Sequence, residues 1–500
     1  MTDFHIEKIA DRCAGFGVKI DGDITERLNL YGNLLLEWNE KMNLTAITAP
    51  EDVLYKHFYD CILFLKAVTP AKNARIIDVG TGAGFPGTVL KIVRPDINVT
   101  LLDSLNTRLV FLNEVIAELG LSGISTVHMR AEDAGKAAAH REKYDIACAR
   151  AVAALPVVGR YRVIDFQMSS LVNSGARNVG VITQRNYHSL MDHLGSGKEW
   201  DLHGKHDGLF ILPPFLTRDN TGVYEGMLDA LRSNLSYLRR SRQEYVVVAD
   251  SHIVVNIDYQ EMLRQHIESA ADITVMYRPI QGTIDSSVPH MYFGMDSNGM
   301  LTEMEVTPDS PSLQYESLAI MIFRREMLIN IVTQATAQGR HHIVRDVLQP
   351  AINDKILRVS GYVCPVPAWN IQSVRSYYSF NMDMLDSALR ARLFDPALPV
   401  YTKVRDDMPA RFGPEANVSG SLIANGANIE GTVTGSVIFR GVKVAKGAVV
   451  RNSIVMQDAV IGENAELDHC IIDKNGIIRA GGRLIGPETY PIVISKNVTI

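Results

Sequence analysis

The stretch Arg75–Leu90, RIIDVGTGAGFPGTVL, constrains the fold more than any other part of this chain. The apolar residues around Asp78 predict a buried strand, and the run Gly87–Val93 predicts a helix. A loop with three glycines separates the two: Gly80, Gly82 and Gly84. This order places backbone N–H groups at the carboxyl end of a strand, where open parallel sheets bind ligands. The stretch therefore predicts a cofactor pocket, and a purely structural turn is the alternative.

The spacing of the glycines narrows the choice of cofactor. It reads G-x-G-x-G, whereas dinucleotide folds use G-x-G-x-x-G to bring a helix N-terminus to a pyrophosphate. A second apolar strand, Ile97–Leu102, ends at Asp103, where a carboxylate can accept hydrogen bonds from two ribose hydroxyls. Together these features disfavour a diphosphate and indicate an adenosine ligand without phosphates, S-adenosylmethionine.

Composition sets outer limits on the function. The chain has 500 residues and a formal net charge of -6, so no strong basic field indicates nucleic acid, and any RNA is bound locally. The five cysteines have no CxxC or metal-ligand spacing, which favours a reducing compartment and predicts no metal site. Neither a membrane-spanning apolar run nor a signal-peptide core is present, so we expect a soluble, cytoplasmic protein without a membrane partner.

Helical spacing precedes the glycine loop at residues 6–10, 24–38 and 50–68. On the third of these helices, Lys56 and His57 lie near Asp60, since neighbouring turns bring such positions together. This polar cluster predicts that Lys56 and His57 bind substrate beside the cofactor. A solvated helix face is the alternative interpretation.

Two further strands complete the predicted sheet of the first half, Ile124–Met129 and Tyr144–Ala149. The first leads into residues 130–133, where the backbone and Glu132 are expected to bracket an adenine ring. Arg150 stands at the carboxyl end of the second strand. It is expected to meet an RNA phosphate or the carboxylate of the cofactor, and a surface salt bridge is the alternative.

Six short words of sequence, taken in order, carry a resemblance over residues 30–155. They are WNEKMNLTAIT (38–48), KHFYD (56–60), DVGTGAGFPG (78–87), LLDS (101–104), RAED (130–133) and ARAVAAL (149–155). This stretch resembles the small-subunit ribosomal RNA methyltransferase G (GidB) family, which methylates N7 of one guanine. The resemblance implies a truncated class I (Rossmann-like) methyltransferase sheet in residues 1–157, with small-subunit ribosomal RNA as partner. It also implies that S-adenosylmethionine is surrounded by Gly80, Phe85, Asp103, Ala131, Glu132 and Arg150, to which the loop adds Gly82 and Gly84.

The chemistry implied by this resemblance needs little from side chains. Guanine N7 is an unprotonated lone pair, so its attack on a sulfonium methyl group needs alignment and exclusion of water more than a general base. No catalytic dyad is therefore expected. Cys148 follows Ala147 and not a proline, so it is interpreted as a buried apolar residue and not as a nucleophile.

The methyltransferase pattern stops before a class I sheet would be complete. After Val157 the sequence becomes GRYRVIDFQMSSLVNSGARNVGVITQRNYHSL. This resembles the interior of a glucose-1-phosphate adenylyltransferase, beginning just after that fold's first strand and phosphate-gripping loop. Over residues 158–395 strands alternate with helices, among them helices over Thr221–Arg239 and Ile371–Leu389, which predicts an α/β nucleotidyltransferase-like domain.

The last part of the chain, residues 396–500, changes character. Apolar residues recur every six positions, with one slip before the fifth: Val449, Val455, Ile461, Leu467, Ile472, Ile478 and Leu484. This hexapeptide repeat is typical of a left-handed β-helix, whose coils bury one apolar residue per side and stack along one direction.

The nucleotidyltransferase-like half lacks parts that adenylyl transfer needs, namely a triphosphate loop and carboxylates for Mg²⁺. The loop is lost at the join. Asp250 matches the family's first metal carboxylate, but Asn370 stands where the resemblance expects the second and carries no charge. The Glu-Lys-Pro word that grips the sugar phosphate is also missing, and residues 305–311 read EVTPDSP. These departures resemble the GlgD-type regulatory subunit, a partner of the catalytic glycogen-pathway subunit. They indicate a vestigial site, and a turn-capping role is the alternative for Asp250.

Three hypotheses follow. The first is a fusion of an S-adenosylmethionine-dependent ribosomal RNA guanine-N7 methyltransferase module with a non-catalytic GlgD-like module of glycogen biosynthesis. The second is a regulatory or assembly subunit of ADP-glucose pyrophosphorylase that carries a passenger methyltransferase fragment. The third is that the join is an artefact of gene assembly, because each truncated sheet would expose an unpaired edge.

Overall fold

The computed structural model describes most of the chain. The described residues are 2–15, 17–42, 44–45, 49–67, 70–79, 81–103, 106–129, 146–148, 155–183, 188–204, 207–213, 224, 226–280, 290–306, 313–488 and 490–500. The chain divides into two compact units. The first comprises Met1–Val152, Leu216–Val223 and Asn497–Ile500, and the second comprises Ala153–Phe215 and Tyr224–Lys496. The domain borders expected after residues 157 and 395 stay predictions.

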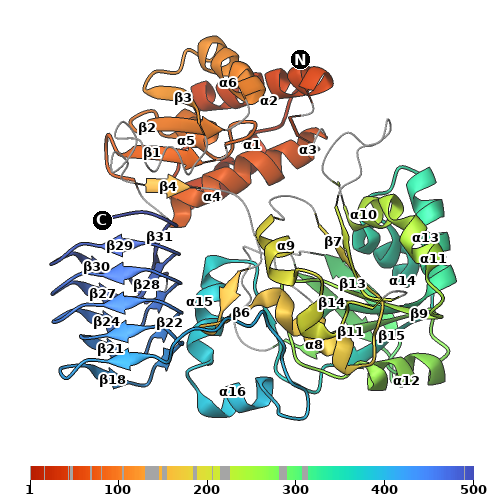
Figure 1. The fold of residues 1–500 in the computed structure, drawn as a ribbon. Helices are drawn as coiled ribbons and strands as arrows, with labels where there is room; N and C mark the ends of the chain where they lie inside the picture. The colour runs from red at the N-terminus through yellow and green to blue at the C-terminus, as the bar shows by residue number, and fades with distance from the viewer. Residues whose placement is uncertain are drawn as a thin grey trace. The chain divides into compact units, whose positions relative to one another are not determined.

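The first unit is built on a parallel sheet (Figure 1). In chain order its elements are β1 (Arg75–Val79), α5 (Gly87–Val93), β2 (Asn98–Asp103), α6 (Asn106–Glu118), β3 (Ile124–His128) and β4 (Ile146–Cys148). The strand order is β3-β2-β1-β4, and each neighbouring pair is parallel. Parallel strands need crossover connections, which α5 supplies between β1 and β2 and α6 supplies between β2 and β3. This is the truncated class I (Rossmann-like) arrangement that the sequence predicts.

Helices from the start of the chain complete the first core. They are α1 (Glu7–Ala14), α2 (Gly22–Met42), α3 (Pro50–Asp52), η1 (Val53–Tyr59) and α4 (Asp60–Ala67). The predicted helix at 50–68 is therefore continuous, but its middle is a π-helical turn, a feature frequent at functional sites. Tyr31 and Phe58 from these helices are fully buried with Leu101 of β2 and Leu112 of α6. One hydrophobic core thus joins the helices to the sheet.

The second unit begins with a short hairpin and a small α/β layer. These comprise β5 (Pro156–Val157), β6 (Tyr161–Arg162), α8 (Val163–Asn173), β7 (Val179–Ile182), α9 (His188–Leu194), η2 (Lys198–Trp200) and β8 (Leu209–Leu212). β7 and β8 form a parallel pair. Trp200 is buried with Ile164 and Met168 of α8 beside this pair, so α8 is held by apolar contacts.

A six-stranded mixed sheet forms the main body of the second unit. Its strands are β9 (Tyr245–Ala249), β11 (Ile273–Pro279), β12 (Met291–Met295), β13 (Leu301–Val306), β14 (Tyr315–Arg324) and β15 (Val359–Val363). The order is β13-β12-β14-β11-β15, and β9 also pairs with β14. The accompanying elements are α10 (Met227–Ser233), α11 (Leu235–Arg240), β10 (Ile253–Val254), α12 (Gln260–Glu268), α13 (Arg325–Ala337), η3 (Val344–Leu348), α14 (Gln349–Asn353), β16 (Trp369–Asn370), α15 (Val374–Asp383) and α16 (Ser387–Leu393). The α/β class predicted for this segment is confirmed.

Two predicted helices are wrong in extent. The run expected over Thr221–Arg239 is divided at Asn234, whose ψ of 15° leaves the helical region between α10 and α11. The run expected over Ile371–Leu389 is likewise divided into α15 and α16, because the Asp386 carboxylate accepts hydrogen bonds that begin a new helix. Apolar periodicity continued through both breaks, so the pattern alone did not show them.

The last part of the second unit forms three five-stranded parallel sheets (blue in Figure 1). The strands of the first sheet are β17 (Arg411–Phe412), β20 (Asn428–Ile429), β23 (Lys443–Val444), β26 (Val460–Ile461) and β29 (Ile477–Ile478). Those of the second are β18 (Asn417–Ser419), β21 (Thr432–Thr434), β24 (Val449–Arg451), β27 (Glu466–Asp468) and β30 (Arg483–Ile485). Those of the third are β19 (Leu422–Ile423), β22 (Val437–Ile438), β25 (Ile454–Val455), β28 (Cys470–Ile472) and β31 (Ile492–Ile494). Each sheet takes one strand from every coil, which fits the predicted left-handed β-helix.

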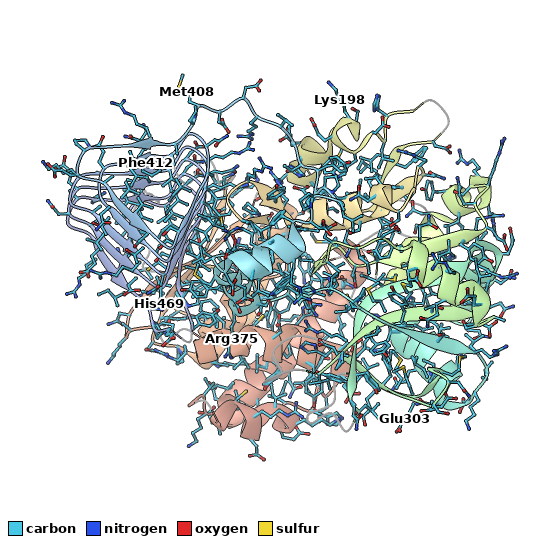
Figure 2. All side chains as sticks on the ribbon, turned by 90° about the horizontal axis from the view of Figure 1, so that it is seen from below. Lys198, Glu303, Arg375, Met408, Phe412 and His469 are labelled. Carbon is cyan, nitrogen blue, oxygen red and sulfur yellow. The ribbon has the colours of Figure 1, made fainter. Side chains whose placement is uncertain are left out.

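The hexapeptide pattern is correct in period and wrong by one residue at its first position. Val450 is fully buried, whereas Val449 is only half-buried. The residues expected at the next three positions, Val455, Ile461 and Leu467, are fully buried. Met408, shortly before β17, and Phe412 of β17 are exposed (both labelled in Figure 2). Each coil therefore buries one apolar side chain per side, and these side chains stack into columns inside the β-helix.

A ladder of side-chain hydrogen bonds crosses the coils inside the β-helix. The Oγ atoms of Ser421, Ser436 and Ser453 accept hydrogen bonds of 3.1 Å from the N–H groups of Ser436, Ser453 and Cys470, respectively. Ser436, Ser453 and Cys470 are fully buried. Each hydroxyl satisfies a backbone group that the parallel ladder leaves without a partner at a corner.

In the part of the chain that the structure describes, no helix combines the length and the apolar character needed to cross a bilayer.

Substituting Ser453→Ala removes the acceptor for the buried N–H of Cys470. A buried donor left without a partner costs about 1–3 kcal/mol. The free energy of unfolding, measured by guanidinium denaturation of the full chain, is expected to fall by about that amount for the β-helix transition. Ser419→Ala on the exposed surface is the matched control and should change it by less than about 0.5 kcal/mol. Equal effects of the two changes would contradict a stabilising role for the ladder.

Candidate functional site

The glycine loop of the first unit is tied to the strand that precedes it. Asp78, near the end of β1, is 1% exposed. Its Oδ2 atom accepts hydrogen bonds from Thr81 Oγ1 at 2.7 Å and from the N–H of Gly87 at 2.8 Å. The carboxylate thus joins the start of the loop to the first residue of α5. This closes residues 81–87 into a compact turn.

The carboxylate predicted to bind the ribose lies beside this loop. Asp103 ends β2, which pairs with β1, and is 2% exposed. Its Oδ2 atom accepts a hydrogen bond of 2.9 Å from the N–H of Gly82, and Arg108 Nη1 lies 3.5 Å away. The structure therefore brings together the loop and the strand-end carboxylate, 21 positions apart in sequence.

Glycine is required within the loop for a steric reason. Gly84 has φ +96°, and a Cβ atom there would lie 2.5 Å from Thr88 Oγ1 and 2.6 Å from Tyr31 OH. The Tyr31 hydroxyl in turn donates a hydrogen bond of 2.5 Å to the carbonyl of Ala83. Burial raises the pKa of Tyr31 well above its usual range, so the hydroxyl keeps the proton that it donates.

Phe85 of the loop packs against His57 of η1. Their rings stack with centroids 4.3 Å apart and planes 8° apart, and both residues are 8% exposed. A hydrogen bond of 2.8 Å joins His57 Nε2 to Thr45 Oγ1. The sequence did not predict this stacking, because it depends on how η1 packs on the loop. The predicted residues Gly80, Ala131, Glu132 and Arg150, and the side chain of Lys56, lie outside the described residues.

The second unit brings Asp250 and the strand of Asn370 to one place. Asp250 follows β9, and β10 pairs with β16 so that Ile253 faces Asn370. His252 connects the two segments, since its Nδ1 atom lies 3.8 Å from Asp250 Oδ1 and its Nε2 atom lies 2.5 Å from Gln372 Nε2. Burial lowers the pKa of His252, and the Asp250 carboxylate offsets this in part. Asp250 and Asn370 together offer one carboxylate and one amide, whereas two carboxylates would suit a Mg²⁺ ion better.

A buried ionic network next to this strand was missed by the sequence reasoning. Glu316 accepts a hydrogen bond of 2.8 Å from Arg278 Nε, and its other oxygen lies 2.6 Å from His290 Nδ1. Arg278 Nη1 also donates to the carbonyl of Ala368, directly before β16. Burial raises the pKa of Glu316, but the hydrogen bonds from His290 and Arg278 hold it below its usual value. Glu316 lies on β14, Arg278 lies on β11 and His290 directly precedes β12, so only the pairing of strands reveals the network.

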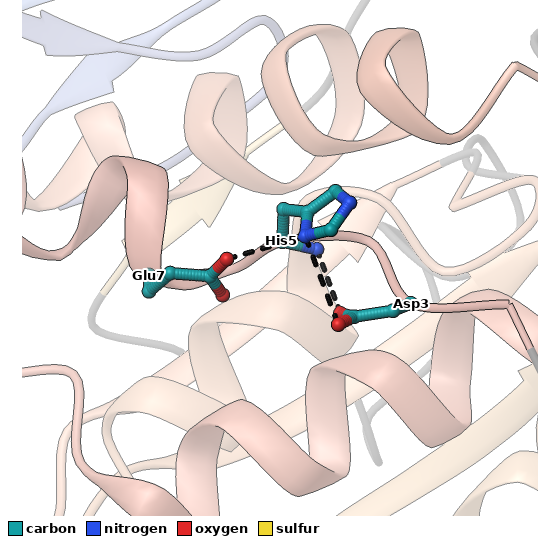
Figure 3. Close-up of side chains that lie close together, drawn as sticks. All are labelled: Asp3, His5 and Glu7. Atoms are coloured by element: carbon teal, nitrogen blue, oxygen red, sulfur yellow. Dashed lines mark hydrogen bonds and ion pairs between the residues drawn. The ribbon is translucent and has the colours of Figure 1, made fainter.

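One further cluster of titratable groups lies near the N-terminus (Figure 3). His5 Nδ1 is 3.2 Å from Glu7 Oε1 and 3.7 Å from Asp3 Oδ2, and all three side chains are exposed. Exposed ion pairs of this kind contribute little to stability. We therefore assign no ion to this cluster.

Comparisons with known families give three matches along the chain. Residues 24–163 match the family described as rRNA small subunit methyltransferase G (GidB), residues 144–388 match nucleotidyl transferase, and residues 408–489 match the GlmU-like C-terminal hexapeptide. The first two matches overlap at residues 144–163. The chain thus carries a GidB methyltransferase domain, a nucleotidyltransferase domain and a left-handed β-helix in series.

Curated relatives match between 60% and 71% of the chain. Glycogen biosynthesis protein GlgD of Bacillus subtilis is 34% identical over 357 residues, which are 71% of this chain and 92% of the relative. The chain belongs to the GlgD and glucose-1-phosphate adenylyltransferase family. GlgD of Geobacillus stearothermophilus is 38% identical over 60% of this chain and 77% of the relative. Glucose-1-phosphate adenylyltransferase of Thermomicrobium roseum is 37% identical over 67% and 78%.

The charge and exposure of Asp250 and Asn370 in this GlgD-like part can be compared with what a metal site needs. The family includes proteins named glucose-1-phosphate adenylyltransferase, and a metal site in any protein of that kind would need charged oxygen ligands. Asp250 is 39% exposed and can reach solvent. Asn370 Oδ1 is buried without a hydrogen-bond partner in the described part of the chain. An amide in that environment supplies no charge to hold a metal ion.

Proposed function

We propose that the first unit binds S-adenosylmethionine at the carboxyl ends of β1 and β2 and methylates N7 of a guanine in small-subunit ribosomal RNA. The observation that carries this proposal is the 2.9 Å hydrogen bond between the Gly82 N–H and Asp103 Oδ2. It joins a glycine loop to a buried carboxylate at the end of the neighbouring strand. The GidB match over residues 24–163 supports the same assignment.

The residues present fit an adenosine ligand. Gly82 and Gly84 keep the loop free of side chains, and the Asp103 carboxylate supplies acceptors for hydroxyl groups. Gly80, Phe85, Ala131, Glu132 and Arg150 complete the proposed cofactor set. When bound, the cofactor supplies an electrophilic methyl group.

The tasks left to the protein are alignment of the guanine and exclusion of water. Lys56 and His57 stay the predicted substrate contacts. His57 gains the further role of supporting Phe85, on which it stacks. The four described cysteines are free thiols, as in a reducing cytoplasm, which supports a cytoplasmic location.

Asp103→Ala is expected to weaken binding of S-adenosylmethionine by at least about tenfold, equivalent to about 1.4 kcal/mol. The change removes both the proposed ribose acceptor and the acceptor for the Gly82 N–H. Isothermal titration of the full chain measures the affinity. Glu118→Ala, an exposed carboxylate on α6, is the control and should leave it unchanged. If the unsubstituted chain shows no binding, the passenger interpretation of the first unit is correct; equal affinity in all three proteins would place the cofactor elsewhere.

We infer that the second unit is a non-catalytic partner of a catalytic glucose-1-phosphate adenylyltransferase in glycogen biosynthesis. The observation behind this inference is Asn370, an amide paired with β10 close to Asp250. The sequence also lacks the phosphate-gripping loop of the family. The relatives named GlgD, at 34% and 38% identity, support the same assignment.

The full chain, mixed with ATP, glucose 1-phosphate and Mg²⁺, is expected to release no more pyrophosphate than the mixture without protein. The reason is that one carboxylate and no loop remain to hold the metal and triphosphate. Glucose-1-phosphate adenylyltransferase of Thermomicrobium roseum serves as the active control. Turnover by the chain alone, at a rate comparable to the control, would overturn the non-catalytic assignment. Co-elution with a catalytic subunit that alters its rate is the positive result for the partner role.

A further inference from the structure

Two strands of the second unit each leave one backbone edge without a strand partner among the described residues. β7 pairs with β8 only, and β9 pairs with β14 only. Both are rich in valine and isoleucine, which is the composition of strands that are paired on both sides and covered on both faces. Yet all five residues of β9 are only half-buried. The composition of β7 and β9 therefore suits a further neighbouring strand, which the described residues do not supply at either edge.

The direction of the backbone groups of β9 follows from the hydrogen bonds at its two ends. The N–H of Asp250 donates to β14, and the carbonyl of Glu244 accepts from the residue after β14. Because successive residues of a strand point their N–H and C=O groups to opposite sides, those of Tyr245, Val247 and Ala249 point away from β14. Three residues of β9 thus present donors and acceptors at the open edge.

The same reasoning applies to β7. The N–H groups of Val179 and Thr183 donate to carbonyls of the β8 segment. The N–H and C=O groups of Gly180 and Ile182 therefore point away from β8. In addition, Thr183 is 4% exposed, and its Oγ1 atom has no hydrogen-bond partner in the described part of the chain. Gly180 and Ile182 thus present donors and acceptors at the open edge of β7.

The two open edges begin side by side. Asn178, directly before β7, donates from Nδ2 to Ser241 Oγ at 3.1 Å, shortly before β9, and its Oδ1 accepts from Tyr237 OH at 2.9 Å. The starts of the strands are therefore bridged by side chains and not by a backbone ladder. A gap that holds one extra strand separates its flanking strands by two spacings, about 9.6 Å in total. The hydrogen bond between the Asn178 and Ser241 side chains is compatible with such a separation. Because β7 and β9 begin at the same end of the gap, they run parallel to each other.

Apolar contacts continue across both faces of this gap. On one face, Leu171 of α8 packs against the cluster that includes Val181 of β7 and the cluster that includes Val247 of β9. On the other face, Ile182 of β7 and Val246 of β9 pack against a single cluster. The strands therefore share hydrophobic neighbours above and below, although no backbone hydrogen bonds link them.

We propose that the gap between β7 and β9 binds an extended apolar segment of another polypeptide, about five residues long, as a parallel strand. The nucleotidyltransferase match starts at residue 144, but the strand that follows, β4, is paired with β1 in the first unit. No described strand of the chain is left to fill the gap. The partner segment needs free N–H groups on both edges, so it lacks proline, and β-branched side chains on both faces, so it lacks charge.

Hydrogen–deuterium exchange with mass spectrometry tests this proposal on the full chain. The probe is a synthetic peptide of five alternating valine and isoleucine residues with a lysine at each end. Bound as a strand, it is expected to slow exchange about tenfold in segments 178–183 and 244–250, because the open N–H groups become hydrogen-bonded. Exchange in 291–306, which contains β12 and β13, should not change. The same peptide with proline at its centre is the control ligand and should have no effect.

A pair of variants distinguishes binding of the peptide in the gap from non-specific binding elsewhere on the chain. Val247→Asp places a charge on one face of the gap and is expected to weaken the exchange effect at least tenfold. Val404→Asp, at a residue 67% exposed outside the gap, should leave it intact. Unchanged exchange in 315–324 of the Val247→Asp protein verifies that the sheet is folded. Three results would overturn the proposal: equal protection by the proline peptide, no protection by either peptide, or protection that rises with protein concentration in the absence of peptide. The last result would mean that a second copy of the chain fills the gap.

Discussion

The constraint on which this structure depends is that every strand needs hydrogen-bond partners for its backbone. In the first unit β1 has them on both sides, from β2 and β4, and the glycine loop follows from this central strand. In the second unit β14 has the same central place, between β12, β11 and β9. Elsewhere the sheets end early. Among the described residues, β7 and β9 carry apolar residues on both faces but have one partner strand each, so each presents an open backbone edge.

The two units keep different parts of the folds that they resemble. The first keeps the strand ends, the loop and the Asp103 carboxylate of the proposed cofactor site, and Asp78 and Asp103 hold the loop by hydrogen bonds. The second keeps its main sheet and β-helix, whereas the site residues that remain are Asp250 and an amide at Asn370. The β-helix has buried apolar columns and a ladder of serine hydroxyls that accept hydrogen bonds from backbone N–H groups. The chain thus combines a glycine loop closed by buried carboxylates with a regular β-helix.

Local sequence patterns predicted most of this arrangement because they encode local physics. The glycine loop between β1 and α5, the position of Asp103 and the six-residue repeat each depend on residues close in sequence. The errors arise where a pattern is insensitive to a break or a slip, as at Asn234 and at Val449, where Val450 is the buried residue. The stacking of His57 on Phe85 and the network of Arg278, Glu316 and His290 could not be predicted, because they depend on packing between distant segments. The gap beside β9 is likewise a property of strand pairing, which the sequence does not state.

The central claim is that two separate cores lie in one chain and that the first holds the cofactor site. Differential scanning calorimetry of the full chain with and without S-adenosylmethionine tests it most directly. The account predicts two transitions, of which only the one assigned to the first unit moves to higher temperature, since a ligand at 100 times its Kd stabilises the state that binds it by about 2.7 kcal/mol. A single transition for the whole chain, or a shift confined to the transition of the second unit, would contradict it.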